Sequence, residues 1–317
     1  MKVHLHIGQQ KTGSTSIQKF FEINRKALSK QGYLYPKSLG VDKQVGLFKQ
    51  IDDLLDPSSQ VYKSFFKEIE KSKCEHLILS EENLFTLKDE LLDKVGQFLN
   101  SHFQDISIIA YLRRQYDQAA SLYQEVVKGR VFLKYEAWIE KKLNQGYYNY
   151  TWVLERWENR FPEAKMKVKA FYNLLENDIR KDILNEISFP NIEKLNFNEA
   201  FNFKNTGIDT LSIEILRVSN AFVKKGNPKD PEAFRAKVRK YVFGKTFDKK
   251  LVLHYAQKER LWNEFLASNQ ALINKYQLSE DEYFLDKPKE EDGWTNDDHD
   301  PEEVLLELSR IYNLSEG

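Results

Sequence analysis

The feature that most constrains the fold is a glycine loop between a strand pattern and a helix pattern near the start of the chain. The stretch HIGQQKTGSTSIQ, residues 6–18, holds Gly8 and Gly13 five residues apart. Residues 3–8 alternate apolar and polar side chains, as a strand does, and apolar residues recur at helical spacing over 14–31. Strand, tight loop and helix in this order predict a loop whose backbone binds a phosphate-like anion.

Three further segments have the length and composition of buried strands. They are HLILS at 76–80, ISIIAYL at 106–112 and MKVKAFY at 166–172. A helical pattern at 90–100 separates the first two, and continuous apolar strands that alternate with helices are typical of parallel βαβ units. The sequence therefore predicts an α/β fold: a three-layer α/β/α arrangement with a mostly parallel central sheet, of the P-loop NTPase-like kind.

We expect one domain over residues 1–317, with the α/β core in 1–200 and a mainly helical part in 201–317. Helical periodicity dominates after about residue 205, in TLSIEILRVSNAF, FRAKVRKYVF and LWNEFLASNQALINKY. A chain of 317 residues with 41% hydrophobic content can bury a large core.

Composition narrows the classes of partner and compartment. The 48 basic and 48 acidic residues cancel, which argues against nucleic acid or an anionic membrane as a general partner. A single cysteine, Cys74, excludes an internal disulfide and is interpreted as a core thiol. The start MKVHLHIG contains no apolar signal region, and no run of eighteen apolar residues occurs, so we expect a cytoplasmic protein without a transmembrane segment.

Two charged segments stand out in the second part of the chain. Residues 224–250 carry ten lysines and arginines against three acids, which predicts a solvated helix face, with a basic lid as the alternative. Residues 280–303 carry twelve acids against two lysines but match a calcium loop poorly, so an acidic surface segment is expected.

The lysine of the loop is displaced from the position that a triphosphate loop requires. A triphosphate loop places its lysine directly after the second glycine, where Ser14 stands here, whereas Lys11 lies in the loop crown. Backbone N–H groups and nearby hydroxyls can still bind an anion at the helix N-terminus. The hydroxyls in question belong to Thr12, Ser14, Thr15 and Ser16. A crown lysine would lie beside a bridging oxygen of a shorter phosphate group, where it could stabilise a leaving group.

A second candidate anion site follows the predicted strand 106–112. In YLRRQYDQAASLYQ, Ser121 comes eight residues after Arg113, so two helical turns return it toward the strand end. The planar guanidinium suits bidentate contact with phosphate oxygens. Arg114 is the alternative to Arg113.

Both motifs resemble those of the sulfotransferase family. The run Lys11, Thr12, Gly13, Ser14, Thr15 is similar to its 5′-phosphosulfate loop, and the arginine–serine pair Arg113 and Ser121 is similar to its 3′-phosphate site. Over residues 1–185 the chain resembles bacterial members, including RRQYDQAASLYQEVVKG and VLERWENRFPEAKMKVKAFYNLL. The resemblance implies 3′-phosphoadenosine 5′-phosphosulfate as donor, adenosine 3′,5′-bisphosphate as product and Lys11 at the departing oxygen. It implies no metal, and no histidine pair here has metal-ligand spacing with a third ligand.

Transfer of a sulfuryl group to an acceptor hydroxyl needs a base that removes the hydroxyl proton. Two carboxylates that could act as this base follow the predicted strand 76–80. Bacterial relatives of the family often carry a hydroxyl, one residue and a glutamate at this point, which favours Glu82 over Glu81. The structural alternative is a helix N-terminus with Ser80 as its cap. His6 is a weaker candidate, and a core position is expected for it.

The acceptor is less constrained. NQGYYNYTWVLERW, residues 144–157, is rich in aromatic and amide side chains that suit sugar rings, although core packing explains Trp152 and Trp157 equally well. Family analogy favours a carbohydrate or glycolipid hydroxyl. The rival hypotheses are a nucleotide kinase or related phosphotransferase and a non-catalytic relative that binds nucleotide or glycan.

Overall fold

A computed structural model describes residues 1–171, 178–197, 208–226, 230–244, 250–278, 284–290 and 293–313. The chain forms two compact units, and each is built from segments that are far apart in the sequence. Unit 1 comprises Met1–Arg113, Asn149–Lys204 and Ser268–Phe284; unit 2 comprises Arg114–Tyr148, Asn205–Ala267 and Leu285–Gly317.

Unit 1 contains a five-stranded sheet in the order β2-β3-β1-β4-β5, and every neighbouring pair is parallel. The strands are β1 (Lys2–Gly8), β2 (Tyr33–Leu34), β3 (His76–Ser80), β4 (Asp105–Leu112) and β5 (Lys165–Ala170). Four of them were predicted from the sequence within one or two residues. Because β1 lies between β3 and β4, the carboxyl ends of three strands meet at one edge of the sheet.

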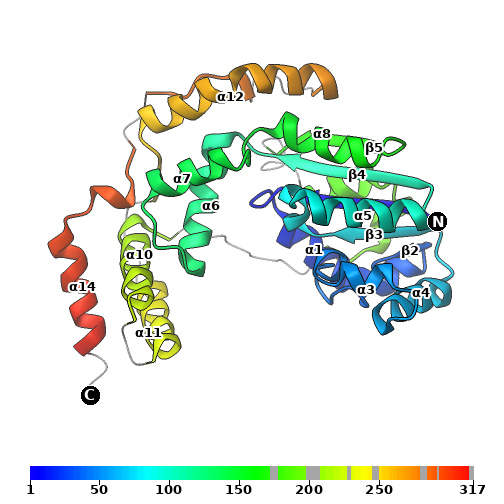
Figure 1. Cartoon of the computed structure of the whole chain (residues 1–317), viewed down its shortest axis with the longest axis horizontal. Coiled ribbons are helices and arrows are strands. Elements are labelled where there is room, and N and C mark those ends of the chain that lie inside the picture. The colour runs from blue at the N-terminus through cyan, green and yellow to red at the C-terminus, as the bar shows by residue number, and fades with distance from the viewer. Residues whose placement is uncertain are drawn as a thin grey trace. The chain divides into compact units, whose positions relative to one another are not determined.

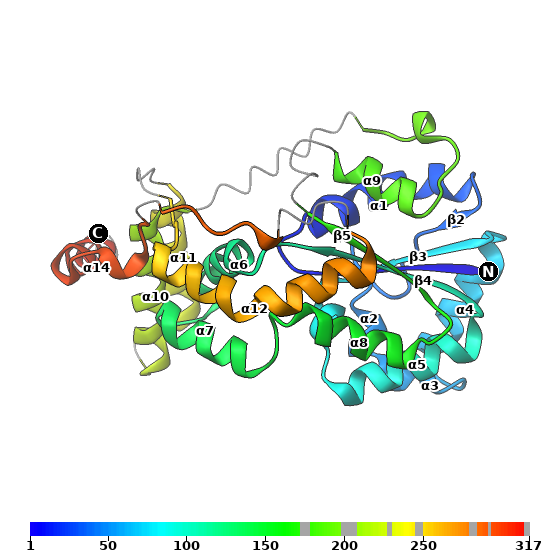
Figure 2. The same ribbon diagram turned by 90° about the horizontal axis from the view of Figure 1, so that it is seen from above.

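Helices cover both faces of this sheet. Figure 2 shows α1 and α9 on one face and α5 and α8 on the other, which confirms the predicted three layers. The described helices of unit 1 are α1 (Ser14–Ser29), α2 (Gly46–Lys49), α3 (Ile51–Leu55), α4 (Gln60–Ser72), η1 (Glu82–Thr86), α5 (Asp89–His102), α8 (Tyr150–Arg160), α9 (Ile179–Glu186), η3 (Ile192–Lys194) and the last part of α12 (Tyr255–Tyr276).

The core of unit 1 explains why α1 stays on the sheet. Its apolar residues recur at helical spacing, and Ile17, Phe20, Phe21 and Leu28 are fully buried with residues of β3, β4 and α9. Burial of one such side chain contributes roughly 1.5–3 kcal/mol, so this face anchors the helix that follows the glycine loop. Cys74 is buried, as expected for a core thiol.

The described part of unit 2 is helical, as predicted for the second part of the chain (Figure 1). Its helices are α6 (Gln115–Gly129), α7 (Tyr135–Asn144), α10 (Thr210–Lys224), α11 (Pro231–Phe243), the first part of α12 (Tyr255–Tyr276), η4 (Asn296–Asp298) and α14 (Pro301–Asn313). The basic segment 224–250 contributes α11, whose exposed residues include Lys237 and Lys240. In both units, no helix among the described residues is long and apolar enough to cross a membrane.

Candidate functional site

The glycine loop lies at the carboxyl edge of the sheet, between β1 and α1. Its backbone turns through three positive φ angles, 104° at Gly8, 67° at Lys11 and 79° at Gly13. A left-handed lysine is unfavourable by about 1 kcal/mol, and such strain is concentrated at functional loops. The conformation is therefore built around the two glycines that the sequence pattern singled out.

Both glycines are also needed because their surroundings leave no space for a side chain. A Cβ on Gly8 would lie 3.0 Å from the Cα and the carbonyl oxygen of Glu82, and a Cβ on Gly13 would lie 2.9 Å from Cδ1 of Ile179. The backbone of Gly8 therefore packs closely on Glu82, just after β3. The backbone of Gly13, at the start of α1, packs closely on Ile179 of α9.

A row of backbone donors in the loop has no acceptor in the part of the chain that the structure describes. Within the described ranges, the N–H groups of Thr12, Gly13, Ser14 and Thr15 donate to no other group, and the first N–H bonded within the helix is that of Ser16, to the Gly13 carbonyl at 2.9 Å. Successive unpaired N–H groups at a helix N-terminus form an anion-binding concavity.

Two of the candidate hydroxyls close the loop. The buried Thr12 and Ser14 hydroxyls both donate to the Gln9 carbonyl, at 2.7 and 3.1 Å. Thr15 is exposed and Ser16 is half-buried, so these two hydroxyls are the more accessible.

Gln9 is a residue that the sequence analysis missed. Its side-chain Oε1 accepts from the backbone N–H of Arg113 at 2.8 Å, and its own N–H donates to the Tyr111 carbonyl at 2.9 Å. The side chain is fully buried, and its Nε2 has no partner among the described residues. A glutamine directly after the first glycine was the available signal, but no pattern in the sequence marks its function.

The structure separates the two adjacent arginines after β4. Arg114 forms an ion pair with Asp117, with Nε 2.8 Å from Oδ2. Arg113 is half-buried, its carbonyl accepts from the Tyr150 hydroxyl at 2.7 Å, and its guanidinium has no partner in the described part of the chain. Arg114 is therefore engaged in an ion pair, and the guanidinium of Arg113 stays the candidate for binding an anion. Ser121 lies half-buried in α6 of unit 2.

Glu82 lies directly against the loop and is held by two side chains. It accepts from Gln18 of α1 at 2.6 Å and from Lys43 at 2.8 Å. Burial alone would raise the pKa of Glu82, but these two bonds outweigh it and hold the pKa below its ordinary value. Glu82 is therefore an ionised carboxylate at neutral pH.

Glu81 is in a different environment. It is fully buried, and burial followed by the neighbouring charge of Glu82 raises its pKa. Its carboxylate caps η1 by accepting from the Asn83 N–H at 3.0 Å. The alternative in which Ser80 caps a helix is wrong, because the Ser80 hydroxyl lies 2.7 Å from Nδ1 of His6 and Glu81 takes the capping role.

His6 is a core residue, as expected. It is buried, and burial lowers its pKa to about 4, so the ring is neutral at physiological pH. Its Nε2 has no partner among the described residues. A base whose pKa lies so far below neutral pH is a weak proton acceptor.

The two candidate tryptophans have separate environments. Trp157 is fully buried and stacks on Phe161 with ring centroids 5.5 Å apart, so it belongs to the core. Trp152 is 41% exposed, and the Arg156 guanidinium lies 4.6 Å from its ring centroid. Of the two, only Trp152 is exposed to solvent.

A comparison with solved structures found a protein of similar structure. No family model matches the chain, and no curated protein matches it. A sulfotransferase from Alicyclobacillus acidocaldarius is similar in structure, with 12% sequence identity and a TM-score of 0.48, over 88% of this chain and 97% of that chain. Among the described residues, no group of three or more His, Cys, Asp or Glu side chains is arranged to hold a metal ion.

The contact between Gly8 and Glu82 predicts a specific cost of a methyl group. Gly32 also has a positive φ, 84°, but no atom lies within 4 Å of its added Cβ. We expect Gly32→Ala to lower the free energy of unfolding by about 1 kcal/mol and Gly8→Ala to lower it by roughly 1–3 kcal/mol more. Urea denaturation of both variants measures the difference, and equal costs would contradict the packing of Gly8 on Glu82.

Burial of His6 predicts an acid-sensitive fold. Below an unfolded pKa of 6.5 the unfolded chain binds a proton that the folded His6 takes up only near pH 4, so stability falls as the pH drops through this window. In total, the free energy of unfolding falls by about 3 kcal/mol across this pH window. We expect His6→Gln to reduce the dependence of the unfolding free energy on pH between about pH 7 and 4.5. Glu81, whose pKa is raised, has the opposite effect on the pH dependence, but this effect is common to both proteins and cancels in the comparison with wild type. If the unfolding free energy of His6→Gln depends on pH as steeply as that of wild type, His6 is not buried in its neutral form.

Proposed function

We propose that the protein is a sulfotransferase that moves a sulfuryl group from 3′-phosphoadenosine 5′-phosphosulfate to an acceptor hydroxyl on a carbohydrate or glycolipid. The observation that carries the proposal is the row of N–H groups from Thr12 to Thr15, which have no acceptor among the described residues, with Lys11 beside it in the crown. Arg113 is tied to the same loop through Gln9. Two groups suited to anions therefore lie at the ends of the adjacent strands β1 and β4.

In this proposal the loop binds the 5′-phosphosulfate. The N–H groups and the accessible hydroxyls of Thr15 and Ser16 contact its oxygens, while Thr12 and Ser14 hold the loop closed. Arg113 and Ser121 bind the 3′-phosphate, as the family resemblance implies. The Gln9 carboxamide keeps the backbone of Arg113 at the loop and offers its Nε2 to the bound nucleotide.

The reaction is a direct displacement at sulfur. The acceptor oxygen attacks the sulfur atom, a new S–O bond forms, and the bond from sulfur to the bridging phosphate oxygen breaks. Adenosine 3′,5′-bisphosphate leaves with the electron pair, and Lys11 stabilises the charge on the departing oxygen. Glu82 takes the proton of the acceptor hydroxyl.

A kinase is the less suitable alternative. The position of the triphosphate lysine is occupied by Ser14, whose hydroxyl is engaged with the Gln9 carbonyl inside the loop. A serine hydroxyl held in this way cannot replace the lysine that reaches the β and γ phosphates in a triphosphate loop.

Replacement of Lys11 tests the proposal. Adenosine 3′,5′-bisphosphate should raise the melting temperature of the wild-type protein, and ATP with magnesium should not. We expect Lys11→Ala to lower labelled sulfate transfer by roughly 10²-fold or more with unchanged urea stability. Lys19→Ala is the control, because Lys19 pairs with Glu22 on α1 and lies outside the loop. Full transfer activity in Lys11→Ala, or stabilisation by ATP alone, would rule the proposal out.

Replacement of the two glutamates identifies the base. Glu82→Gln should lower kcat by about 10²- to 10⁴-fold while the affinity for adenosine 3′,5′-bisphosphate stays unchanged. Glu81→Gln is the matched control, and we expect a smaller effect on kcat because this carboxylate caps η1. The assignment of Glu82 is wrong if Glu82→Gln keeps wild-type kcat or if Glu81→Gln shows the larger loss.

A further inference from the structure

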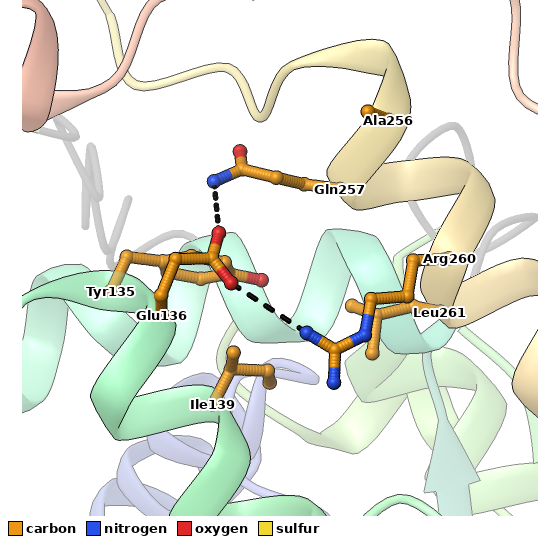
Figure 3. Close-up of a pocket in the computed structure, with 7 residues that line it drawn as sticks. All are labelled: Tyr135, Glu136, Ile139, Ala256, Gln257, Arg260 and Leu261. Carbon is orange, nitrogen blue, oxygen red and sulfur yellow. Dashed lines mark hydrogen bonds and ion pairs between the residues drawn. The ribbon is translucent and has the colours of Figure 1, made fainter.

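Unit 2 contains a cavity that the proposed reaction does not use. It lies between the first turns of α7 and of α12 and has a volume of about 220 Å³. On this measure a single water needs only ~10–15 Å³, so the cavity has room for a ring-sized molecule. Figure 3 shows the lining residues, which are Tyr135, Glu136, Ile139, Ala256, Gln257, Arg260 and Leu261.

One of the residues that line the cavity, Tyr135, has a buried hydroxyl without a partner in the described part of the chain. Tyr135 is 1% exposed, and its hydroxyl has no hydrogen-bond partner among the described residues. Figure 3 shows the side chain reaching from α7 toward the α12 side of the cavity. Burial keeps the pKa of Tyr135 well above its ordinary value, so the group stays a neutral O–H that can donate and accept. Buried hydroxyls are normally paired, so this one is suited to a bound molecule.

The polar rim is already organised. Gln257 donates from Nε2 to Glu136 at 2.6 Å and accepts from the His254 N–H at 3.0 Å, so both ends of its carboxamide are fixed. Arg260 pairs with Glu140, and its Nη1 lies 3.6 Å from Oε2 of Glu136 (Figure 3). The carboxylates of Glu136 and Glu140 therefore share the guanidinium of Arg260. Their oxygens can still accept hydrogen bonds from a ligand.

This charge pattern selects the ligand. An anion would have to displace Glu136 or Glu140 from Arg260, and a cation at Glu136 would lie close to the guanidinium. Neutral hydroxyl groups suit the rim, because they donate to carboxylates at no cost in charge. The apolar wall of Ile139 and Leu261 can contact the C–H face of a ring.

We propose that this cavity binds a neutral, hydroxylated molecule of monosaccharide size, with the Tyr135 hydroxyl paired to one ligand hydroxyl and Glu136 accepting from another. The site does not rest on the proposed sulfuryl transfer, because none of the residues that line it has a role in that reaction and its test measures binding alone.

Ligand-observed NMR and calorimetry on the full chain test the proposal. The probes are methyl glucoside, methyl galactoside, N-acetylglucosamine, inorganic sulfate and propylamine, each titrated separately. We expect at least one sugar to saturate a single site, and no competition from sulfate or propylamine. Tyr135→Phe removes only the hydroxyl and should weaken that sugar about fivefold or more, with no loss of melting temperature. Tyr148→Phe, at a buried tyrosine of the same unit outside the cavity, should bind as wild type does.

A second variant keeps the test decisive if Tyr135→Phe is unstable. Ala256→Leu adds bulk at an exposed lining position of α12 and should abolish sugar binding while the helix is retained. The proposal fails if no sugar saturates a site, if sulfate or propylamine displaces the sugar, or if Tyr135→Phe and Tyr148→Phe weaken binding equally.

Discussion

The arrangement of the candidate site depends on the parallel pairing of β1 with β3 on one side and with β4 on the other. The pairing continues past the strand ends, since the Glu81 N–H donates to the His6 carbonyl at 3.0 Å and the Gln9 N–H donates to the Tyr111 carbonyl at 2.9 Å. Backbone hydrogen bonds of the sheet thus set how far the loop lies from Glu82 and from Arg113. Groups positioned by a sheet keep their spacing without the entropy cost of ordering long side chains.

Glu82 combines two requirements that oppose each other. Its backbone packs on Gly8, and its carboxylate is fixed by Lys43 and Gln18, so its position is well defined. The same bonds lower its pKa, and a carboxylate with a lowered pKa is a weaker base. In the proposed reaction, an acceptor hydroxyl that replaces one of these donors would restore basicity at the moment when the proton is transferred.

The sequence predicted the sheet and the loop well because their signals are local. Residues 76–80 and 106–112 are continuous apolar runs, and they form β3 and β4 to within a residue. The β2 strand has only two residues, too few for any periodic pattern. The pairing of Glu82 with Lys43 joins residues 39 positions apart, and the role of Ser80 depends on the neighbouring strand, so neither could be predicted from local preference. Trp152 and Trp157 share a helix and a residue type, and tertiary packing alone makes one exposed and the other buried.

The charge balance at the sheet edge bears on which donor the loop suits. Lys43 lies 2.8 Å from a Glu82 oxygen and 3.8 Å from a Glu81 oxygen, so its positive charge is matched within the fold. In the proposed reaction the incoming donor would then meet the Arg113 guanidinium and the neutral N–H dipoles of Thr12 to Thr15. Fixed dipoles stabilise charge that develops on a leaving oxygen without reorganising, whereas a triphosphate needs additional full charges to bind. Lys11 has a strained, left-handed backbone. This conformation places the lysine at the turn of the loop, where the departing oxygen of the proposed reaction would lie.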